Sequence, residues 1–235
     1  MIDSVAMGQI TVSTGAGDVV LRHPPAILVF ERLGIPMGLM DKSLGEVAEE
    51  GGINPHLLLE LLHVTLTHSP GIVDVLQPSD GLRIVDFLEQ SHKFYSQTAY
   101  PRIVALIHEM RHGAGDKSFE LVESFFKKYT DEVEEHFAYE SQVAFPYVRG
   151  VLSGEQPQAG DYSVKVYKSR HEDIEDKLGD LESLLVKYLP MRESYAIRRE
   201  LFLRIHELGD DLSAHTCIED HILIPLVERE ELRWN

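Results

Sequence analysis

The sequence is poor in several features that would each point to a particular class of protein. Its single cysteine, Cys217, allows neither an internal disulfide framework nor a CxxC redox pair. Its net charge of −17 argues against binding to nucleic acid or anionic membranes, because both need clustered Lys and Arg. No apolar run approaches the roughly 20 residues of a membrane span, and no basic segment followed by an apolar block opens the chain. These absences predict a cytoplasmic protein without nucleic-acid or membrane partners.

Strand signals are also nearly absent, and helical signals divide the chain into three regions. We expect a flexible arm at 1–20, a small helical module at 21–75 and a four-helix bundle at 79–232. In the module, Gly34 is placed to end one helix, and Asn54 is placed to cap another that begins with a proline. A chain of 235 residues, 43% of them hydrophobic, can bury a core of this size.

The bundle region consists of long amphipathic stretches with short connections. The motifs HGAGD, SGEQPQAGD and LPMRES separate them. Short connections between long amphipathic helices favour antiparallel neighbours, so the predicted fold class is an all-α, up-down-up-down four-helix bundle. The four stretches run over 79–112, 116–152, 161–190 and 193–230. We expect Pro101 to kink the first stretch, and Pro146 and Pro225 to end or bend their helices.

Two segments of the bundle region repeat one pattern. Residues 136–148 read HFAYESQVAFPYV and residues 215–227 read HTCIEDHILIPLV, so a histidine, a glutamate four residues later, a proline and a valine coincide. A further histidine stands 44 residues ahead of each segment, at His92 and His171. Because this pattern occurs twice, it predicts two related helical hairpins.

The repeat directs metal-binding side chains at the bundle axis. Positions i and i+4 share a helix face, so the second and fourth helices can each present an imidazole and a carboxylate. A single histidine–glutamate pair of this spacing is more often a contact on the surface of a helix. Because the pair occurs twice, each time 44 residues after another histidine, a metal site is favoured. The candidate ligands are His92, His136, Glu140, His171, His215 and Glu219. Glu175, one turn after His171, is an additional candidate that could instead be solvated.

This set of donors narrows the choice of metal. Imidazoles with carboxylates suit iron, manganese or zinc, and the absence of thiolate clusters argues against an iron–sulfur cluster. Two carboxylates able to bridge describe a dinuclear site, for which iron is the expected occupant. A ferritin-like site is disfavoured, because neither His136 nor His215 has a glutamate three residues before it. By the symmetry of the repeat, each iron takes the histidines of one hairpin: His92 with His136, and His171 with His215.

The order of these residues resembles the hemerythrin family, whose four helices carry a lone His, His-x3-Glu, a second His and His-x3/4-acid. Within that superfamily the chain is most similar to the di-iron proteins that repair iron–sulfur clusters after nitrosative and oxidative stress. Those proteins also carry a small helical N-terminal module, which residues 24–66 resemble. The resemblance implies that the six candidate ligands hold two iron ions joined by an oxo or hydroxo bridge.

The chain departs from this pattern at two places. Oxygen-carrying hemerythrins have a second histidine four residues after the one on the third helix, where this chain has Glu175. We therefore expect a more open metal pair than in an oxygen carrier. The repair proteins place a cysteine pair just after the turn of their module, whereas this chain continues GIPMGLM, so no thiol-dependent step carries over.

The resemblance implies one expected function and leaves two alternative functions open. We expect a stress-response protein whose di-iron centre reacts with O2, NO or peroxide and serves iron–sulfur client proteins. Sensing or binding of O2 or NO, and iron storage or detoxification, are the alternatives; whether the protein is an enzyme stays open, and the sequence names no catalytic residue. The acidic balance of the module disfavours DNA binding and leaves docking or homodimerisation as its expected role.

Overall fold

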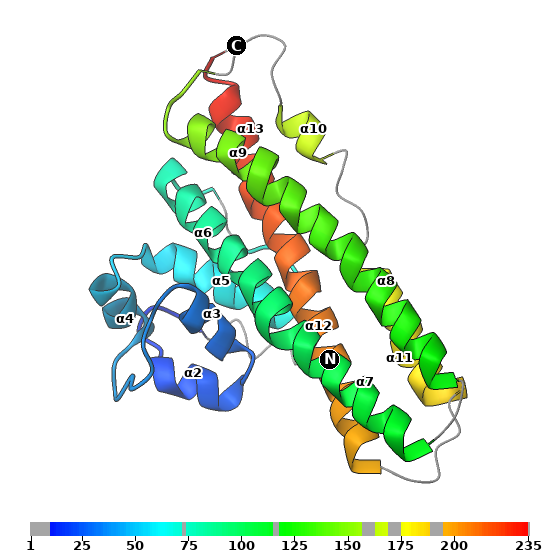
Figure 1. Cartoon of the computed structure of the whole chain (residues 1–235). Coiled ribbons are helices and arrows are strands. Elements are labelled where there is room, and N and C mark those ends of the chain that lie inside the picture. The colour runs from blue at the N-terminus through cyan, green and yellow to red at the C-terminus, as the bar shows by residue number, and fades with distance from the viewer. Residues whose placement is uncertain are drawn as a thin grey trace. The chain divides into compact units, whose positions relative to one another are not determined.

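The regular structure of the chain is helical (Figure 1). The computed structural model describes residues 10–71, 74–114, 118–156, 163–168, 175–188 and 195–234. Across these ranges, strand-like pairing is limited to one isolated bridge between Gly15 and Ser43. The predicted all-α bundle is confirmed. Within the same ranges, no helix combines the length and the apolar character needed to cross a membrane.

Four short helices precede the bundle: α2 (Ala16–Arg22), α3 (Ala26–Arg32), α4 (Leu44–Glu50) and α5 (Pro55–Thr67). The first of them begins inside the range 1–20 that we expected to form a flexible arm. Local capping explains where the others lie. Ser43 and Glu46 form a reciprocal capping box at α4, and the Asn54 side chain accepts a hydrogen bond from the backbone at the start of α5. Gly34, with a φ of 72°, follows α3 and ends it as predicted.

The predicted long stretches correspond to chains of helical elements. The first contains α6 (Pro78–Phe94), η1 (Tyr95–Ala99) and α7 (Tyr100–Ala114). The second contains α8 (Ser118–Tyr139), η2 (Glu140–Ala144) and α9 (Phe145–Leu152). The third contains α10 (Val164–Lys168), α11 (Glu175–Ser183) and η3 (Leu184–Tyr188). The fourth contains α12 (Tyr195–Ile218), η4 (Glu219–Leu223) and α13 (Ile224–Glu231).

Each η element is a π-helical segment of five residues, and a proline follows each one after a single intervening residue. A proline inside an α-helix lacks a donor for the i−4 carbonyl and clashes with it. In a π segment the hydrogen bonds run from i to i−5 instead: the Tyr100 N–H donates to the Tyr95 carbonyl, and the Ile224 N–H to the Glu219 carbonyl. Pro146 and Pro225 therefore do not end their helical stretches, which continue through α9 and α13.

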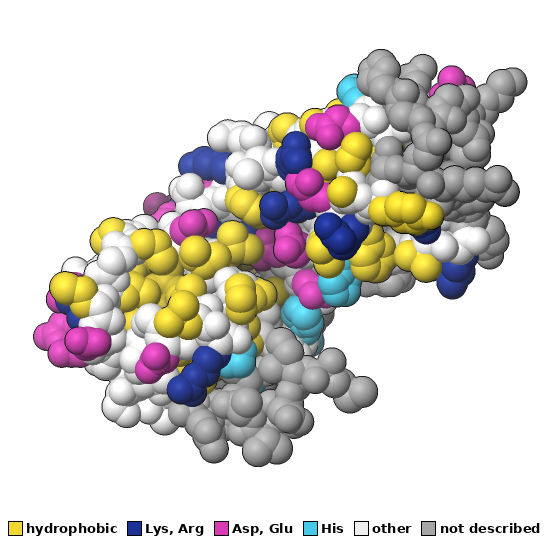
Figure 2. Space-filling model, turned by 90° about the horizontal axis from the view of Figure 1, so that it is seen from below, with side chains coloured by type: hydrophobic (Ala, Val, Ile, Leu, Met, Phe, Trp, Pro, Cys, Tyr) yellow, Lys and Arg dark blue, Asp and Glu magenta, His cyan; other side chains and the backbone are white. Residues whose placement is uncertain are grey.

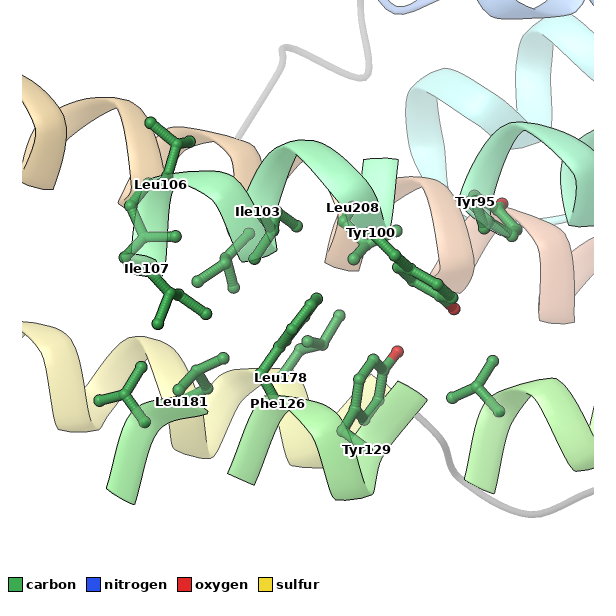
Figure 3. Packing of buried hydrophobic residues seen from close by; sticks show 14 of the residues in the cluster. Tyr95, Tyr100, Ile103, Leu106, Ile107, Phe126, Tyr129, Leu178, Leu181 and Leu208 are labelled. Carbon is green, nitrogen blue, oxygen red and sulfur yellow. The ribbon is translucent and has the colours of Figure 1, made fainter. Parts of the chain in front are cut away.

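The described residues fall into two compact units. The second unit comprises 91–144 and 171–213, so it includes α7, α8, α11 and most of α12. Aromatic and aliphatic side chains from these helices interdigitate in its core, where Phe126 packs edge-on against Tyr100 with ring centroids 6.0 Å apart (Figure 3). This core draws on four helices that the sequence predicts as amphipathic, which is the packing expected of a bundle.

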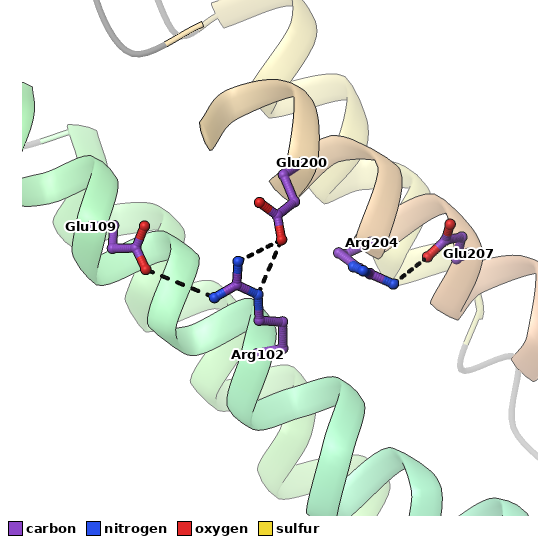
Figure 4. A network of polar contacts seen from close by, with 5 residues as sticks. All are labelled: Arg102, Glu109, Glu200, Arg204 and Glu207. Atoms are coloured by element: carbon purple, nitrogen blue, oxygen red, sulfur yellow. Dashed lines mark hydrogen bonds and ion pairs between the residues drawn. The ribbon is translucent and has the colours of Figure 1, made fainter. Parts of the chain in front are cut away.

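Ion pairs on the surface of the second unit connect its helices. Arg102 on α7 donates two hydrogen bonds to Glu200 on α12, at 2.5 and 3.1 Å, and lies 3.8 Å from Glu109 (Figure 4). Exposed pairs of this kind each contribute only about 0–1 kcal/mol. On the face of the molecule in Figure 2, acidic, basic and hydrophobic side chains are interspersed. The core therefore supplies most of the stability of this unit.

The first unit comprises Met1–Gln90, Phe145–Arg170 and Ala214–Asn235, so it joins the short N-terminal helices to α9, α10 and α13. Polar contacts connect these segments. The Asn54 side chain donates to Asp80 at 2.9 Å, and Arg32 lies over the Phe87 ring, 5.5 Å from its centroid. The Arg229 guanidinium donates to the carbonyl of residue 76 at 2.7 Å. The N-terminal helices thus share a unit with part of the bundle.

Candidate metal centre

The first half of the repeat forms a buried His–Glu–His contact in the second unit. His92 lies near the end of α6, His136 near the end of α8, and Glu140 is the first residue of η2. Glu140 is fully buried and offers one carboxylate oxygen to each histidine: Oε2 lies 3.2 Å from His92 Nε2, and Oε1 lies 3.0 Å from His136 Nε2. The predicted i, i+4 pair is therefore a real contact inside the protein and not on its surface.

A second contact orients one of these histidines. The His92 ring stacks on Phe137, with ring centroids 3.9 Å apart and an interplanar angle of 15°. Phe137 stacks in turn on Tyr95, whose hydroxyl donates a hydrogen bond to the backbone carbonyl of Asp211. The imidazole is thus held between an apolar ring and a carboxylate, which fixes the direction of its Nε2 atom.

The second half of the repeat forms a corresponding contact in the first unit. His215 lies near the end of α12, and Glu219 is the first residue of η4. His215 Nε2 lies 3.4 Å from Glu219 Oε1, and both side chains are buried. The Tyr167 hydroxyl donates a hydrogen bond to the same Glu219 oxygen at 2.9 Å. This glutamate therefore has a phenol among its partners.

Both glutamates open a π-helical segment, and the sequence explains why. Pro146 and Pro225 each stand six residues after the glutamate, and the π segment between them accommodates the proline. Single-turn π segments are rare and concentrate at functional sites. The proline that coincides in the two repeated segments is thus linked to the local geometry of each glutamate.

Each half of the repeat thus holds a buried carboxylate against imidazole. Glu140 lies against His92 and His136 in the second unit, and Glu219 lies against His215 in the first. Imidazoles and carboxylates in a buried setting are donors that first-row transition metals accept, and buried carboxylates are costly unless they are paired or coordinate a metal. These donors fit a metal centre.

Comparison with known proteins agrees with this donor set. The family model described as the hemerythrin HHE cation binding domain matches residues 84–228, which is more than half of the chain. The chain belongs to the hemerythrin family. No curated protein matched the sequence.

The hemerythrin domain contains all six predicted ligands. The structure places His92 and His136 against Glu140, and His215 against Glu219. His171 lies outside the described residues, and Glu175 begins α11 but its side chain is not among those described. The assignment of the four histidines to two separate ions therefore stays a prediction.

Other candidate residues take ordinary roles in the hemerythrin domain. His108 and His206 are exposed and contact Glu123 and Glu182, as expected for histidines off the ligand faces. Burial, with a smaller contribution from nearby carboxylates, raises the pKa of Cys217 to about 11. Its thiol is therefore protonated at neutral pH, and the side chain is buried like that of a small apolar residue.

Sequence reasoning missed two residues of the site, Phe137, which stacks on His92, and Tyr167, which donates to Glu219. Tyr167 stands four residues before His171, so the helical spacing that identified the two His–Glu pairs could have drawn attention to it. Tyrosine is common in helical cores, however, and its contact with Glu219 joins residues 52 positions apart. Only the tertiary structure identifies that contact.

Proposed function

We propose that this hemerythrin-family protein holds two iron ions and reacts with O2, NO or peroxide. The observation that carries the proposal is that both glutamates of the repeat are buried against imidazole, Glu140 against His92 and His136, and Glu219 against His215. Mixed imidazole and carboxylate donors suit iron, and they lack the soft thiolates that copper or an iron–sulfur cluster would prefer. His171 completes the proposed ligand set.

The protein's own residues prepare this site in three ways. Burial of Glu140 and Glu219 excludes water and keeps both carboxylates directed inward. Phe137 stacks on His92 and limits the rotation of its ring. The hydroxyl of Tyr167 holds one oxygen of Glu219. Iron bound to these side chains would supply reversible one-electron redox chemistry toward small oxidants.

The biological role we propose is repair of iron–sulfur clusters in the cytoplasm under nitrosative or oxidative stress. Its support is the order of the ligands, a lone His and a His-x3-Glu in each half, together with the helical segment that precedes the bundle. The turn after Gly34 has no cysteine pair, so the proposed role uses the metal centre and no thiol chemistry.

Reconstitution with iron under anaerobic conditions tests both parts of the proposal. We expect close to two iron ions per chain, and restored activity when the loaded protein is mixed with a cluster enzyme that NO has damaged. Glu140→Gln should hold iron about 100-fold more weakly and restore less activity at limiting iron, whereas Glu135→Gln, which changes an exposed glutamate on α8, should match the wild type. Reversible O2 binding without repair would favour a binding or sensing protein, and failure to bind iron would refute the site.

A further inference from the structure

The short helix α10 places a phenol against one of the proposed ligands. Tyr167 lies in α10, its side chain is 1% exposed, and its hydroxyl donates to Glu219 Oε1 at 2.9 Å. A hydrogen bond from a neutral donor to a carboxylate is charge-assisted, and such bonds are shorter and stronger than bonds between neutral groups. The contact is therefore well suited to fix the orientation of the carboxylate.

A second carboxylate anchors α10 in the same unit. Glu231 Oε1, on α13, accepts a hydrogen bond from the Val164 backbone N–H at 3.1 Å and another from the Tyr147 hydroxyl on α9. The Val164 side chain is 1% exposed, so apolar packing accompanies this polar anchor. Because α10 is attached at Val164 as well as through Tyr167, the phenol hydroxyl has a defined position relative to Glu219.

The oxygen of Glu219 that accepts the phenol also faces a histidine. Glu219 Oε1 lies 3.4 Å from His215 Nε2 and accepts the Tyr167 hydroxyl at 2.9 Å. A hydrogen bond to a ligand oxygen occupies one of its acceptor directions and withdraws electron density from it. The Tyr167 hydroxyl therefore acts on the carboxylate oxygen that lies next to a proposed ligand.

We propose that Tyr167 is a positioning residue that orients Glu219 and tunes its electron donation to a bound metal. This inference rests on the proposed metal-binding function. The Tyr167 hydroxyl restricts the directions from which Glu219 Oε1 can bind a metal, and it lowers the electron donation of that carboxylate. The lower donation favours the reduced state of a bound iron, so loss of the hydroxyl lowers the reduction potential.

The test compares Tyr167→Phe with Tyr100→Phe. Each substitution removes one buried phenol hydroxyl, but Tyr100 lies in the hydrophobic core of the second unit and does not contact α10 or Glu219 in the contacts described. Titration with Co2+ alone gives the affinity and the d–d spectrum, and titration of the iron-loaded protein with redox mediators gives the potential. We expect Tyr167→Phe to bind one of the two ions about 10- to 100-fold more weakly, the usual effect of losing an outer-shell partner. Its spectrum should change and its potential should fall, while Tyr100→Phe matches the wild type.

Three further outcomes have distinct meanings. If Tyr167→Phe and the wild type bind Co2+ with the same affinity and spectrum and share one potential, the positioning role is refuted. If Tyr100→Phe reproduces the effects of Tyr167→Phe, the hydroxyl at Glu219 has no special role and the inference is again refuted. If the wild type itself binds neither Co2+ nor iron, the proposed metal function fails first. Melting curves of the metal-free proteins identify any variant that is merely unfolded.

Discussion

Glu140→Gln provides a quantitative test of the metal centre. The substitution preserves the shape of a fully buried side chain, but it replaces the carboxylate whose oxygens lie 3.0 Å from His136 Nε2 and 3.2 Å from His92 Nε2. A four-ligand site binds its metal with about 10–16 kcal/mol, so one ligand is worth about 3 kcal/mol. At 1.4 kcal/mol per factor of ten, its loss weakens binding on the order of 100-fold.

Thermal unfolding with and without anaerobic Fe2+ converts this loss into a measured shift. At a free metal concentration about 1,000 times the wild-type Kd, binding stabilises the wild type by about 4 kcal/mol, whereas a variant with a 100-fold higher Kd gains about 1.4 kcal/mol. For a chain of this length about 2–4 °C correspond to each kcal/mol, so Fe2+ should raise the Tm by about 8–16 °C and 3–6 °C respectively.

Glu135→Gln is the matched control for this experiment. Glu135 is exposed on α8, five residues before Glu140, and its substitution makes the same change in charge. Its metal-dependent shift should equal that of the wild type. Equal shifts in the wild type and in Glu140→Gln would refute the assignment of Glu140 as a ligand.

Three further predictions concern the site and the core. His136→Ala should lower the iron-to-protein ratio measured by metal analysis, whereas His108→Ala, which removes an exposed ring, should leave it unchanged; equal ratios would exclude His136 as a ligand. Burial raises the pKa of Tyr100 in the folded protein. Above about pH 10 its phenol therefore ionises first in the unfolded chain, and the free energy of unfolding falls by up to about 1.4 kcal/mol per pH unit. Tyr100→Phe should therefore move the alkaline unfolding midpoint, followed by circular dichroism, to higher pH, and coincident curves would contradict this. Leu106→Ala should cost about 2–5 kcal/mol in denaturant unfolding, because Leu106 is fully buried, whereas Leu203→Ala, at 48% exposure, should cost far less; similar losses would mean that the core is packed differently.

The sequence alone determined those features that depend on local spacing. A histidine and a glutamate four residues apart share a helix face whatever surrounds the helix, so both pairs could be recognised before the structure was known. The cap at Asn54 involves residues within one turn of the helix, and the sequence predicted it too. The family assignment confirms that this local pattern was sufficient to identify a hemerythrin-like bundle.

Only the tertiary structure decided which partners each carboxylate meets. The contacts of Glu140 with His92 and of Glu219 with Tyr167 join residues 48 and 52 positions apart, and no local periodicity specifies which oxygen faces which donor. The π segments lie between these two cases. Prolines at 101, 146 and 225 predicted that the α-helical hydrogen bonds would be interrupted. Only the structure shows that a π segment precedes each proline and that an α-helix continues after it. Local spacing thus predicted the candidate ligands, and long-range packing decided which side chains from other helices meet each carboxylate.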